Sequence, residues 1–294
     1  MIRELKTLVA VARDGTFAAA GQRIGLTQAA VSAQMQRLED ELGFALFDRT
    51  GRSARLNAMG QQTLERAQEI IRLSNELGSR RIGRPATVLV NIGAIASVQR
   101  LTLPDALARF HKQNKDCRTR VTPGLSIHLL NLADAGEIDM AAIIRPPFAL
   151  HSDLRWTTLA HEPFRLLVPR QVEGDDWAEI LTTHPLVRYN RSSFGGRQVD
   201  RFLRGAHLSV RDICEADELE AIVRLVANGV GVALVPETAS QPKWPAAIRA
   251  VDLGPDTFHR DIGLVHRAPR GMSEPARLLA ELLCSAYGRP TASK

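Results

Sequence analysis

The chain contains few cysteines and no long hydrophobic run. Its 294 residues include 3 cysteines, Cys117, Cys214 and Cys284, and an odd number of widely spaced thiols supports neither a disulfide framework nor a zinc site. No stretch of about eighteen apolar residues is present that could cross a membrane, and no leader for export is recognisable. We therefore expect a cytoplasmic protein without a metal, a cofactor or a membrane partner.

Motifs of the common catalytic sites are also missing. The sequence has no GxSxG, P-loop or metal-binding pattern. His207 and Cys214 lie seven residues apart across a predicted strand, which would place them on opposite faces because successive side chains alternate. His184 precedes a proline in a loop, with no paired carboxylate nearby. An enzyme is therefore not expected, and a transport receptor would need the missing export leader.

Positive charge is concentrated in the first part of the chain. The whole chain has 38 Lys and Arg against 32 Asp and Glu, a net charge of +6. Residues 1–84 hold 13 basic and 9 acidic side chains, so this segment carries +4 of that excess. A modest basic excess favours a polyanionic partner such as DNA, although sequence readout and oligomerisation must add to it. The hydrophobic content of 45% suffices for packed cores in about two to three domains.

The first part of the sequence predicts helices separated by tight turns. Apolar residues at helical spacing give the first helix one face, while glycines mark helix ends and threonines offer N-caps. The first helix is expected to end at Gly15, a second to span residues 17–24, and a third to follow Thr27. These expectations rest on Leu5, Leu8, Val9, Ala12, Thr16, Gly25 and Leu26.

The third predicted helix has one apolar face and one uncharged polar face. Val31, Met35, Leu38 and Leu42 form the apolar stripe. The opposite face carries residues that can hydrogen-bond base edges or contact a thymine methyl group. This layout is typical of a helix-turn-helix that enters the DNA major groove; an ordinary amphipathic helix pair is the alternative. The candidate DNA-binding residues here are Thr27, Gln28, Ala29, Ser32, Ala33 and Gln36.

A short basic hairpin is predicted directly after these helices. Residues 46–56 place Gly51 at a turn between two short strands. Arginine side chains on such a wing suit contacts with phosphates or with the minor groove. A solvated charged turn is the alternative, and the position next to the helix pair favours the wing. Its candidate DNA-binding residues are Arg49, Arg52 and Arg55.

Together, residues 1–60 resemble the winged helix-turn-helix of LysR-type transcriptional regulators. Three positions depart from the family pattern: Ala29 replaces a usual proline, Gly21 a usual alanine, and Ala33 a frequent arginine. Gly21 is expected to weaken its helix by about 1 kcal/mol relative to alanine. The matching residues are Phe17, Ala20, Thr27, Gln28, Ser32, Gln34, Leu38, Glu39, Glu41, Leu42, Gly43, Leu46, Phe47, Arg49, Arg52, Leu56 and Gly60.

Residues 57–81 predict a long amphipathic helix that Asn57 can cap. Packing of its apolar stripe against the same chain is the simpler interpretation. The resemblance implies instead that this linker helix pairs antiparallel with that of another subunit, giving a dimer that spans two half-sites, or a tetramer. Gly83 and Pro85 then indicate a hinge over residues 80–85. The candidate dimerisation residues are Leu64, Ala67, Ile71 and Leu77.

From Thr87 onward, predicted strands and helices alternate, which is typical of parallel sheets covered by helices. Apolar strands are expected at 88–92, 120–122, 140–144, 164–169, 186–189, 208–212 and 230–235. Helices are expected from Ser97 past Phe110, from Ser126 to Gly136, and over 194–203 and 218–227. The last segments, 262–265 and 275–287, are expected to return to the first of two lobes.

The stretch from Asp217 to Pro236, with its Gly229-Val230-Gly231-Val232 segment, resembles the effector domain of LysR-type regulators. The resemblance implies an α/β, two-lobed fold like that of periplasmic solute-binding proteins, following an all-α-type winged helix-turn-helix. The predicted domains are the winged helix-turn-helix (1–58), the linker helix and hinge (59–86) and the effector-binding domain (87–294). Lobe 1 is expected at about 87–163 and 267–294, and lobe 2 at about 164–266.

Ligands of such folds bind where strands end and helices begin. Serines at helix starts offer hydroxyl and backbone N–H donors that suit a carboxylate, and Arg145 could add a charged, bidentate contact. The alternative is that Ser97 and Ser126 only cap their helices and that Arg145 is a surface residue. The candidate effector-binding residues are Ala96, Ser97, Val98, Ser126, Arg145, Pro146, Asn190, Ser192, Ser193 and Phe194.

The sequence therefore predicts a sequence-specific transcriptional regulator that responds to a small anionic metabolite. Its expected partners are a double-stranded DNA operator, the effector, further copies of itself as a dimer or tetramer, and RNA polymerase. A redox-sensing regulator acting through Cys214 is the alternative, although no close resolving cysteine is visible. An accessible, acidic Cys214 thiol would favour redox sensing, whereas stabilisation by a ligand would favour metabolite sensing.

Overall fold

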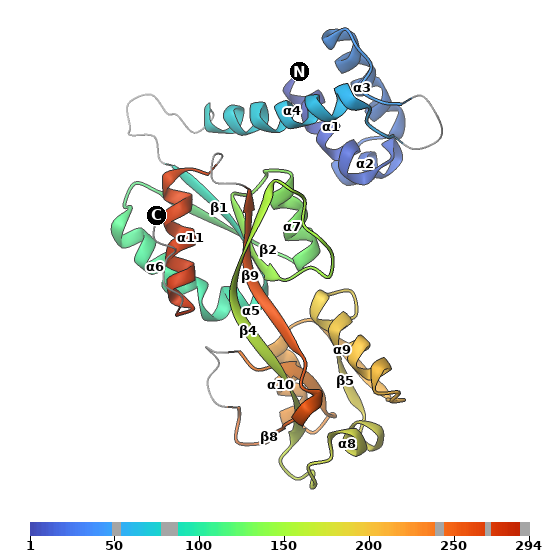
Figure 1. The fold of residues 1–294 in the computed structure, drawn as a ribbon, viewed down its shortest axis with the longest axis vertical. Helices are drawn as coiled ribbons and strands as arrows, with labels where there is room; N and C mark the ends of the chain where they lie inside the picture. The colour runs from blue at the N-terminus through green and yellow to red at the C-terminus, as the bar shows by residue number, and fades with distance from the viewer. Residues whose placement is uncertain (49–53, 78–87, 239–243, 268–271, 289–294) are drawn as a thin grey trace. The chain divides into compact units, whose positions relative to one another are not determined.

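The computed structural model describes residues 1–48, 54–77, 88–238, 244–267 and 272–288. The chain divides into two compact units (Figure 1). Unit 1 consists mainly of residues 1–88, and its described elements are helices and one short bridge. Unit 2 contains most of residues 89–294 and mixes strands with helices.

Three helices form the base of unit 1, and each ends at a glycine. Gly15, Gly25 and Gly43 have φ angles of 70°, 71° and 78°, a left-handed conformation that glycine adopts without steric cost. Thr16 and Thr27 cap the second and third helices, since each Oγ1 accepts the backbone N–H three residues later at 3.2 Å. The predicted stops and caps are confirmed. The helices are α1 (Ile2–Asp14), α2 (Phe17–Ile24) and α3 (Gln28–Leu42).

The core of unit 1 lies between these helices. Leu8, Val11, Val31 and Leu38 have no exposed surface. A buried polar pair joins α1 to α3, because the Thr7 hydroxyl donates to the Gln34 side-chain oxygen. Burying polar groups is tolerated when they satisfy one another, so this pair fixes the angle between the two helices as well as their contact.

The chain then forms the base of the predicted wing and a long helix. Phe47 and Leu56 make an antiparallel bridge, while the tip of the hairpin lies outside the described residues. Helix α4 (Ala58–Leu77) follows and packs against α1. Asn57 caps it as predicted, since its Oδ1 accepts the N–H of Gly60 at 2.8 Å. A Cβ on Gly60 would lie 2.1 Å from the carbonyl oxygen of Leu46, so this close approach requires glycine.

Unit 2 contains two separate hydrophobic cores, which define lobe 1 and lobe 2. In lobe 1, β1 pairs in parallel with β2 and β3. All five residues of β3 are buried, as expected for a strand covered on both faces. Helices α6 and α11 cover one side of the sheet and α7 the other (Figure 1). The elements of lobe 1 are β1 (Leu89–Ala94), α5 (Ala96–Leu101), α6 (Leu103–Gln113), β2 (Arg118–Pro123), α7 (Ser126–Asp134), β3 (Met140–Ile144) and α11 (Glu274–Ala286).

Lobe 2 is built on a small parallel pair, β5 and β6. Leu186 of β5 also forms a bridge with Val232, the residue directly before β7. Strands β7 and β8 pair with β4, and α10 packs against β4, β5 and β7. The elements of lobe 2 are α8 (Trp177–Thr183), β5 (Leu186–Tyr189), α9 (Phe194–Gly205), β6 (Asp212–Ala216), α10 (Leu219–Ala227), β7 (Ala233–Pro236), β8 (Ile248–Val251) and the 3-10 helix η1 (Gly254–Asp256).

Two long strands connect the lobes. β4 (Leu154–Pro169) and β9 (His259–Arg267) pair antiparallel along most of their length and run together from lobe 1 into lobe 2 (Figure 1). β9 also pairs with β3 in lobe 1. The α/β fold class with a two-lobed second domain, predicted from the sequence, is confirmed.

Several element boundaries differ from the predictions. The strand expected at 208–212 is β6, Asp212–Ala216, because Leu208 and Val210 pack as loop residues against the lobe 2 core. The helix expected from Ser97 is divided at Thr102 into α5 and α6. The strand expected at 230–235 is β7, Ala233–Pro236.

The lobe boundary expected at residue 266 also shifts. Ile262, Leu264 and Val265 belong to the lobe 1 core, whereas Phe258 packs on the lobe 2 core. The chain therefore passes from lobe 2 to lobe 1 inside β9.

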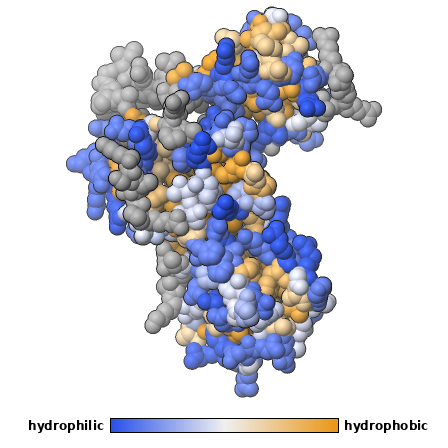
Figure 2. Space-filling view, in the orientation of Figure 1, coloured by the Kyte–Doolittle hydropathy of each residue, from blue (hydrophilic) through white to orange (hydrophobic). Residues whose placement is uncertain are grey.

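The visible surface is mainly hydrophilic, with hydrophobic residues in separate patches (Figure 2). Among the described helices, none combines the length and the apolar content that a membrane span requires.

Candidate DNA-binding surface and ligand cavity

The residues predicted to read DNA all lie on the exposed side of the α3 region. They are opposite Val31, Met35 and Leu38, which are at most 2% exposed. Gln36 is engaged within the helix, since its Nε2 donates to Asp40 Oδ1 at 3.0 Å. By contrast, the side chains of Gln28 and Ser32 make no hydrogen bond to another described side chain or backbone group. The exposed residues are Thr27, Gln28, Ala29, Ser32, Ala33 and Gln36.

The base of the wing is fixed to the helix-turn-helix. The rings of Phe17 and Phe47 meet edge to face, with centroids 5.2 Å apart. Arg55 is exposed on the described part of the wing. Its neighbours in the prediction, Arg49 and Arg52, lie outside the described residues. Of the three predicted wing arginines, Arg55 is the one that falls within the described residues, and the base of the wing packs against α2.

The predicted dimerisation stripe of α4 packs within its own chain. Ala67 is 1% exposed in the unit 1 core, and Leu64 and Ile71 are partly buried against the same core. The side chain of Leu77 lies outside the described part of the structure. A second apolar stripe is exposed, with Met59, Ile70 and Leu73 between 40% and 46% exposed.

A cavity lies between the two lobes of unit 2, at the carboxyl ends of the parallel strands. Its volume is about 240 Å³, somewhat below the usual range for drug-sized ligands, which suits a small metabolite. Lobe 1 contributes the start of α5, the turn before α7 and the end of β3. Lobe 2 contributes the loop after β5 and the start of α10. The lining residues are Ile95, Ala96, Ser97, Gln99, Pro123, Gly124, Leu125, Ser126, Ile144, Tyr189, Ser193, Asp217, Glu218 and Leu219.

Four candidate effector-binding residues line this cavity: Ala96, Ser97, Ser126 and Ser193. Ser193 is an ordinary N-cap, since its Oγ accepts the N–H of Gly196 at 3.0 Å. Ser126 is 3% exposed, and its Oγ accepts the N–H of Ile144 at 3.1 Å, so it ties α7 to β3 instead of capping a helix. Neither Ser97 nor Ser126 caps its helix in the way that the simpler interpretation supposed.

The other six candidates lie outside the cavity lining. Arg145 is 58% exposed; it faces Asp261 at 3.6 Å and stacks over Trp156 at 5.8 Å. Phe194 is buried, and it contacts the exposed Phe148 of lobe 1 edge to face at 6.0 Å. The remaining four are Val98 and Pro146, which are buried, Asn190, which is half-buried, and Ser192, which is exposed.

A buried arginine behind the cavity was not predicted from the sequence. Arg260 on β9 is 1% exposed, and its Nε donates to Glu162 Oε2 of β4 at 2.7 Å. Its two other nitrogens donate to Ser97 Oγ at 3.3 Å and Tyr189 Oη at 3.4 Å. Burial is the largest single influence and acts to lower the pKa of Arg260, but the charge and hydrogen bond of Glu162, together with Tyr189 and Tyr287, raise that pKa overall. Arg260 therefore stays charged and connects the crossing strands with both lobes.

The charged side chains in the cavity lining are those of Asp217 and Glu218, and both are carboxylates. Glu218 pairs with Arg100 across the lobes, at 3.2 Å, and Arg100 also pairs with Glu220 of α10. Burial, reinforced by the charge of Glu218, raises the pKa of Asp217. The side chain of Asn190 acts to lower the pKa of Asp217, but it is the weaker influence.

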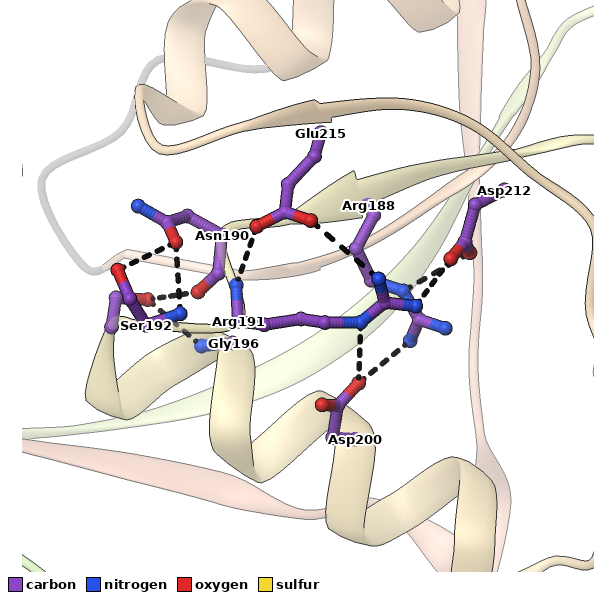
Figure 3. A network of polar contacts seen from close by, with 9 residues as sticks. Arg188, Asn190, Arg191, Ser192, Gly196, Asp200, Asp212 and Glu215 are labelled. Carbon is purple, nitrogen blue, oxygen red and sulfur yellow. Dashed lines mark hydrogen bonds and ion pairs between the residues drawn. The ribbon is translucent and has the colours of Figure 1, made fainter.

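A network of arginines and carboxylates supports the lobe 2 side of the cavity (Figure 3). Arg188 is nearly buried between Asp200 of α9 and Asp212 of β6, at 3.0 and 3.1 Å. Arg191 pairs with the same two carboxylates and with Glu215, whose Oε1 also accepts the Arg191 backbone N–H at 3.0 Å. The network fixes the loop after β5, which carries Asn190, Ser192 and Ser193, to both α9 and β6.

The three cysteines are divided between the two lobes in the described structure. Cys117, Cys214 and Cys284 are not disulfide-bonded. Cys117 and Cys284 pack against the lobe 1 core, whereas Cys214 lies on β6 of lobe 2. Within the described residues, no three His, Cys, Asp or Glu side chains are grouped so that they could hold a metal ion.

An exposed polar helix beside a wing, joined in one chain to a two-lobed domain with an internal cavity, defines a DNA-binding regulator with a ligand-binding module. Residues 2–61 match the model of the bacterial regulatory helix-turn-helix protein, lysR family, and residues 85–287 match that of the LysR substrate binding domain. The chain therefore belongs to the LysR family, and it is a LysR-type transcriptional regulator.

Individual relatives support this assignment. IlvR of Caulobacter vibrioides is 30% identical over 260 residues, 86% of this chain and 87% of IlvR. YofA of Bacillus subtilis is 27% identical over 237 residues, 80% of this chain and 81% of YofA. A full-length OxyR variant of Pseudomonas aeruginosa shares the fold with a TM-score of 0.60 at 23% identity, covering 98% of this chain and 94% of its own. CbnR in complex with its target DNA gives 0.54 at 22% identity, covering 97% and 99%.

Proposed function

We propose that unit 1 reads an operator sequence with α3 and that the unit 2 cavity binds the effector controlling this regulator. The support for DNA reading is the exposed, uncharged face of α3, whose Gln28 and Ser32 side chains have hydrogen-bonding capacity to spare. Such side chains discriminate bases in the major groove, while Arg55 would add phosphate affinity. The expected base and phosphate contacts are those that a helix-turn-helix makes when its second helix lies in the major groove.

The observation that carries the effector proposal is a cavity whose walls come from both lobes. A ligand in such a cavity contacts both walls only when the lobes are closed, so it shifts the equilibrium towards the closed form. The donors of the lobe 1 wall, the Ser97 and Ser126 hydroxyls and the backbone N–H groups at the start of α7, suit a carboxylate group. We therefore propose a small carboxylate-bearing metabolite as the effector.

The active form is proposed to be a dimer or tetramer. Met59, Ile70 and Leu73 of α4 fall within about 60° of one another around the helix axis, at 100° per residue. The residues that pack inside unit 1 occupy a separate arc. An exposed apolar stripe on a long helix suits a second copy of the same helix. A contact with RNA polymerase remains a prediction from the family resemblance.

The experiment combines operator binding with ligand binding. An operator is selected from random duplex DNA with the full chain, and a library of small metabolites is screened by thermal shift. We expect a carboxylate-bearing compound to stabilise the protein and to change its operator affinity. Ser97→Trp, which fills the cavity, should abolish both effects while leaving operator binding without ligand nearly intact. Unchanged ligand response in that variant would contradict the proposed effector site.

Redox sensing through Cys214 makes a different prediction. Cys214→Ser should then abolish a peroxide response and leave ligand stabilisation unchanged. A peroxide response of operator binding that Cys214→Ser removes would establish the redox mechanism instead.

A further inference from the structure

Asp217 stands out among the charged groups at the cavity because no cation balances it. It lies in the cavity lining, directly before α10. The neutral side chain of Asn190 lies close enough to favour the ionised form of Asp217. Among the described residues, no Lys, Arg or His lies within ion-pair distance of its carboxylate. Asp217 is exposed, so its carboxylate is accessible and is available to pair with a basic group of a ligand in the cavity.

The neighbouring charges are already matched. Glu218 faces Arg100 at 3.2 Å. Arg260 faces Glu162 at 2.7 Å behind the cavity wall. Arg145, which was expected to supply the positive charge for an anionic ligand, lies outside the lining and pairs with Asp261 at 3.6 Å. The unmatched charge at the cavity is therefore negative, and it belongs to lobe 2.

The two walls of the cavity differ in what they can bind. The lobe 1 wall presents the Ser126 and Ser97 hydroxyls and the first turn of α7, which spans nine residues, Ser126–Asp134. That wall accommodates negative charge through N–H and O–H donors. The lobe 2 wall presents Asp217 as a charged acceptor. A ligand that satisfies both walls has an acidic group at one end and a basic group at the other.

We propose that the effector carries a protonated amine as well as a carboxylate, and that Asp217 determines this specificity by pairing with the ammonium group. The ligand class is thus the small amino acids and related amino-carboxylates. This inference rests on the proposed function, because it takes the interlobe cavity to be the effector site. The volume of about 240 Å³ suits a molecule of that size.

The pKa of Asp217 gives the inference a pH signature. Burial and Glu218 raise this pKa in the free protein, so the folded state holds a proton more tightly than the unfolded state does. The stability contributed by that protonated form is lost as the pH rises through the raised pKa. An ammonium group would instead favour the ionised carboxylate, so amino acid affinity should fall as the pH drops through the same range.

The test is a thermal-shift and calorimetric comparison of three matched probe classes on the full chain. Each L-amino acid is compared with its 2-hydroxy acid, which lacks the amine, and with the corresponding amine, which lacks the carboxylate. We expect stabilisation by one or more amino acids and little by their matched analogues. Asp217→Asn should weaken the amino acid by about tenfold to a hundredfold, as for a hydrogen bond to a charged group, and leave the hydroxy acid unchanged.

Asp217→Asn keeps the shape of the side chain and its acceptor oxygen, so its fold is expected to persist. Because Asp217 is exposed, the substitution should change the melting temperature of the free protein little. A purely structural role would instead lower the stability and give equal losses for every ligand. Asp256→Asn in η1, exposed and outside the cavity, is the matched control and should change neither stability nor affinity.

The outcomes separate this inference from the proposed function. Binding of hydroxy acids at least as tight as that of amino acids would overturn the amine specificity and leave the effector site standing. Equal affinity of an amino acid for the unmodified chain and for Asp217→Asn would overturn the role of Asp217. A panel in which no class binds would overturn both the inference and the proposed effector site.

Discussion

Individual side chains on α3 differ in what they should contribute to DNA binding. Gln28 and Ser32 are exposed and make no hydrogen bond to another described side chain or backbone group, whereas Gln36 is held by Asp40 at 3.0 Å. A free amide can pair with a base edge at no prior cost, while Gln36 must first give up its contact. The specificity of the operator should therefore depend more on Gln28 than on Gln36.

Gln28→Ala is expected to cost about 1–3 kcal/mol on the selected operator and almost nothing on random DNA, because it removes a base contact. Arg55→Ala is the matched comparison; it should weaken both DNAs alike and reduce the salt dependence, because it removes a phosphate contact. Fluorescence anisotropy at several salt concentrations measures both. Equal losses on the two DNAs for Gln28→Ala would contradict base readout by this residue.

The buried pair of Arg260 and Glu162 should dominate the stability of unit 2 at the residue scale. Arg260→Met leaves Glu162 buried without a counter-charge, which is expected to cost about 3–5 kcal/mol. Adding Glu162→Gln removes the orphaned charge, so the double variant should recover much of that loss. Chemical denaturation of the full chain measures the three proteins. A loss below about 1 kcal/mol in the single variant would show that the pair is not isolated from water.

At the scale of the element, α9 depends on glycines where it meets the loop after β5. A Cβ on Gly196 would lie 1.9 Å from the Asn190 carbonyl oxygen, a backbone atom that cannot move away alone. We expect Gly196→Ala to destabilise the protein by about 1–3 kcal/mol and to weaken ligand binding, because it displaces Asn190 and Ser193. Gly205→Ala, at the other end of α9 with nothing within 4 Å of its Cβ, is the control. Similar melting temperatures for the two variants would contradict this argument.

The exposed stripe of α4 leads to a separate prediction. Ile70→Asp puts a charge into the proposed contact between subunits, where it would be desolvated without a partner. The variant should dissociate towards monomers and bind the operator more weakly, although no DNA contact changes. Gln61→Asp, on the same helix but outside the stripe, should have neither effect. Light scattering and anisotropy test this; a monomeric unmodified protein at micromolar concentration would make the proposed dimer wrong.

Elements with local signals could be predicted, and elements fixed by distant contacts could not. Thr16, Gly25 and Asn57 mark their helices because caps and left-handed turns depend on neighbouring residues. The sequence predicts the strand at 208–212 instead of at β6, because the apolar Leu208 and Val210 precede β6. The side chains of β6 itself are largely exposed at a sheet edge. Gly21 was expected only to weaken α2, yet a Cβ there would lie 2.6 Å from the Leu26 carbonyl oxygen.

The candidate site shows the same limit. The sequence places Ser97, Ser126 and Ser193 near one another because parallel strands bring their carboxyl ends together, and all three line the cavity. Arg260 contacts a serine 163 residues away, and no linear pattern indicates such a contact. Asp217 falls inside the segment that carries the family resemblance. The acidic residues that follow it, Glu218 and Glu220, pair with Arg100, and that difference depends on contacts between distant segments.

For the whole molecule, the contacts between the lobes suggest an equilibrium between open and closed forms. The ion pairs of Arg100 with α10 join partners that are 36% to 54% exposed, and such exposed pairs contribute about 0–1 kcal/mol. The covalent and sheet connection through β4 and β9 persists in both forms. These ion pairs therefore add little to the closed form, whereas Phe194 of α9 packs against the lobe 1 core.

Arg100→Ala should accordingly lower ligand affinity by at most about fivefold, the equivalent of 1 kcal/mol. The effect should shrink at high salt, because screening already weakens the pairs in the unmodified protein. Isothermal titration at low and high ionic strength measures this, with Arg204→Ala at the exposed end of α9 as the control. A loss far above fivefold, or one that salt does not reduce, would indicate that Arg100 contacts the ligand itself.

The passage of β4 and β9 between the lobes also bears on the order in which the chain can fold during its synthesis. Lobe 2 is continuous in sequence between these strands, so it can fold as soon as β8 and η1 have been made. Lobe 1 needs residues from both sides of lobe 2, because β3 pairs with β9 and α6 packs against α11. Contacts of such long sequence separation form slowly. The cavity is therefore completed last, and a chain released before α11 would present a folded lobe 2 beside an unfinished lobe 1.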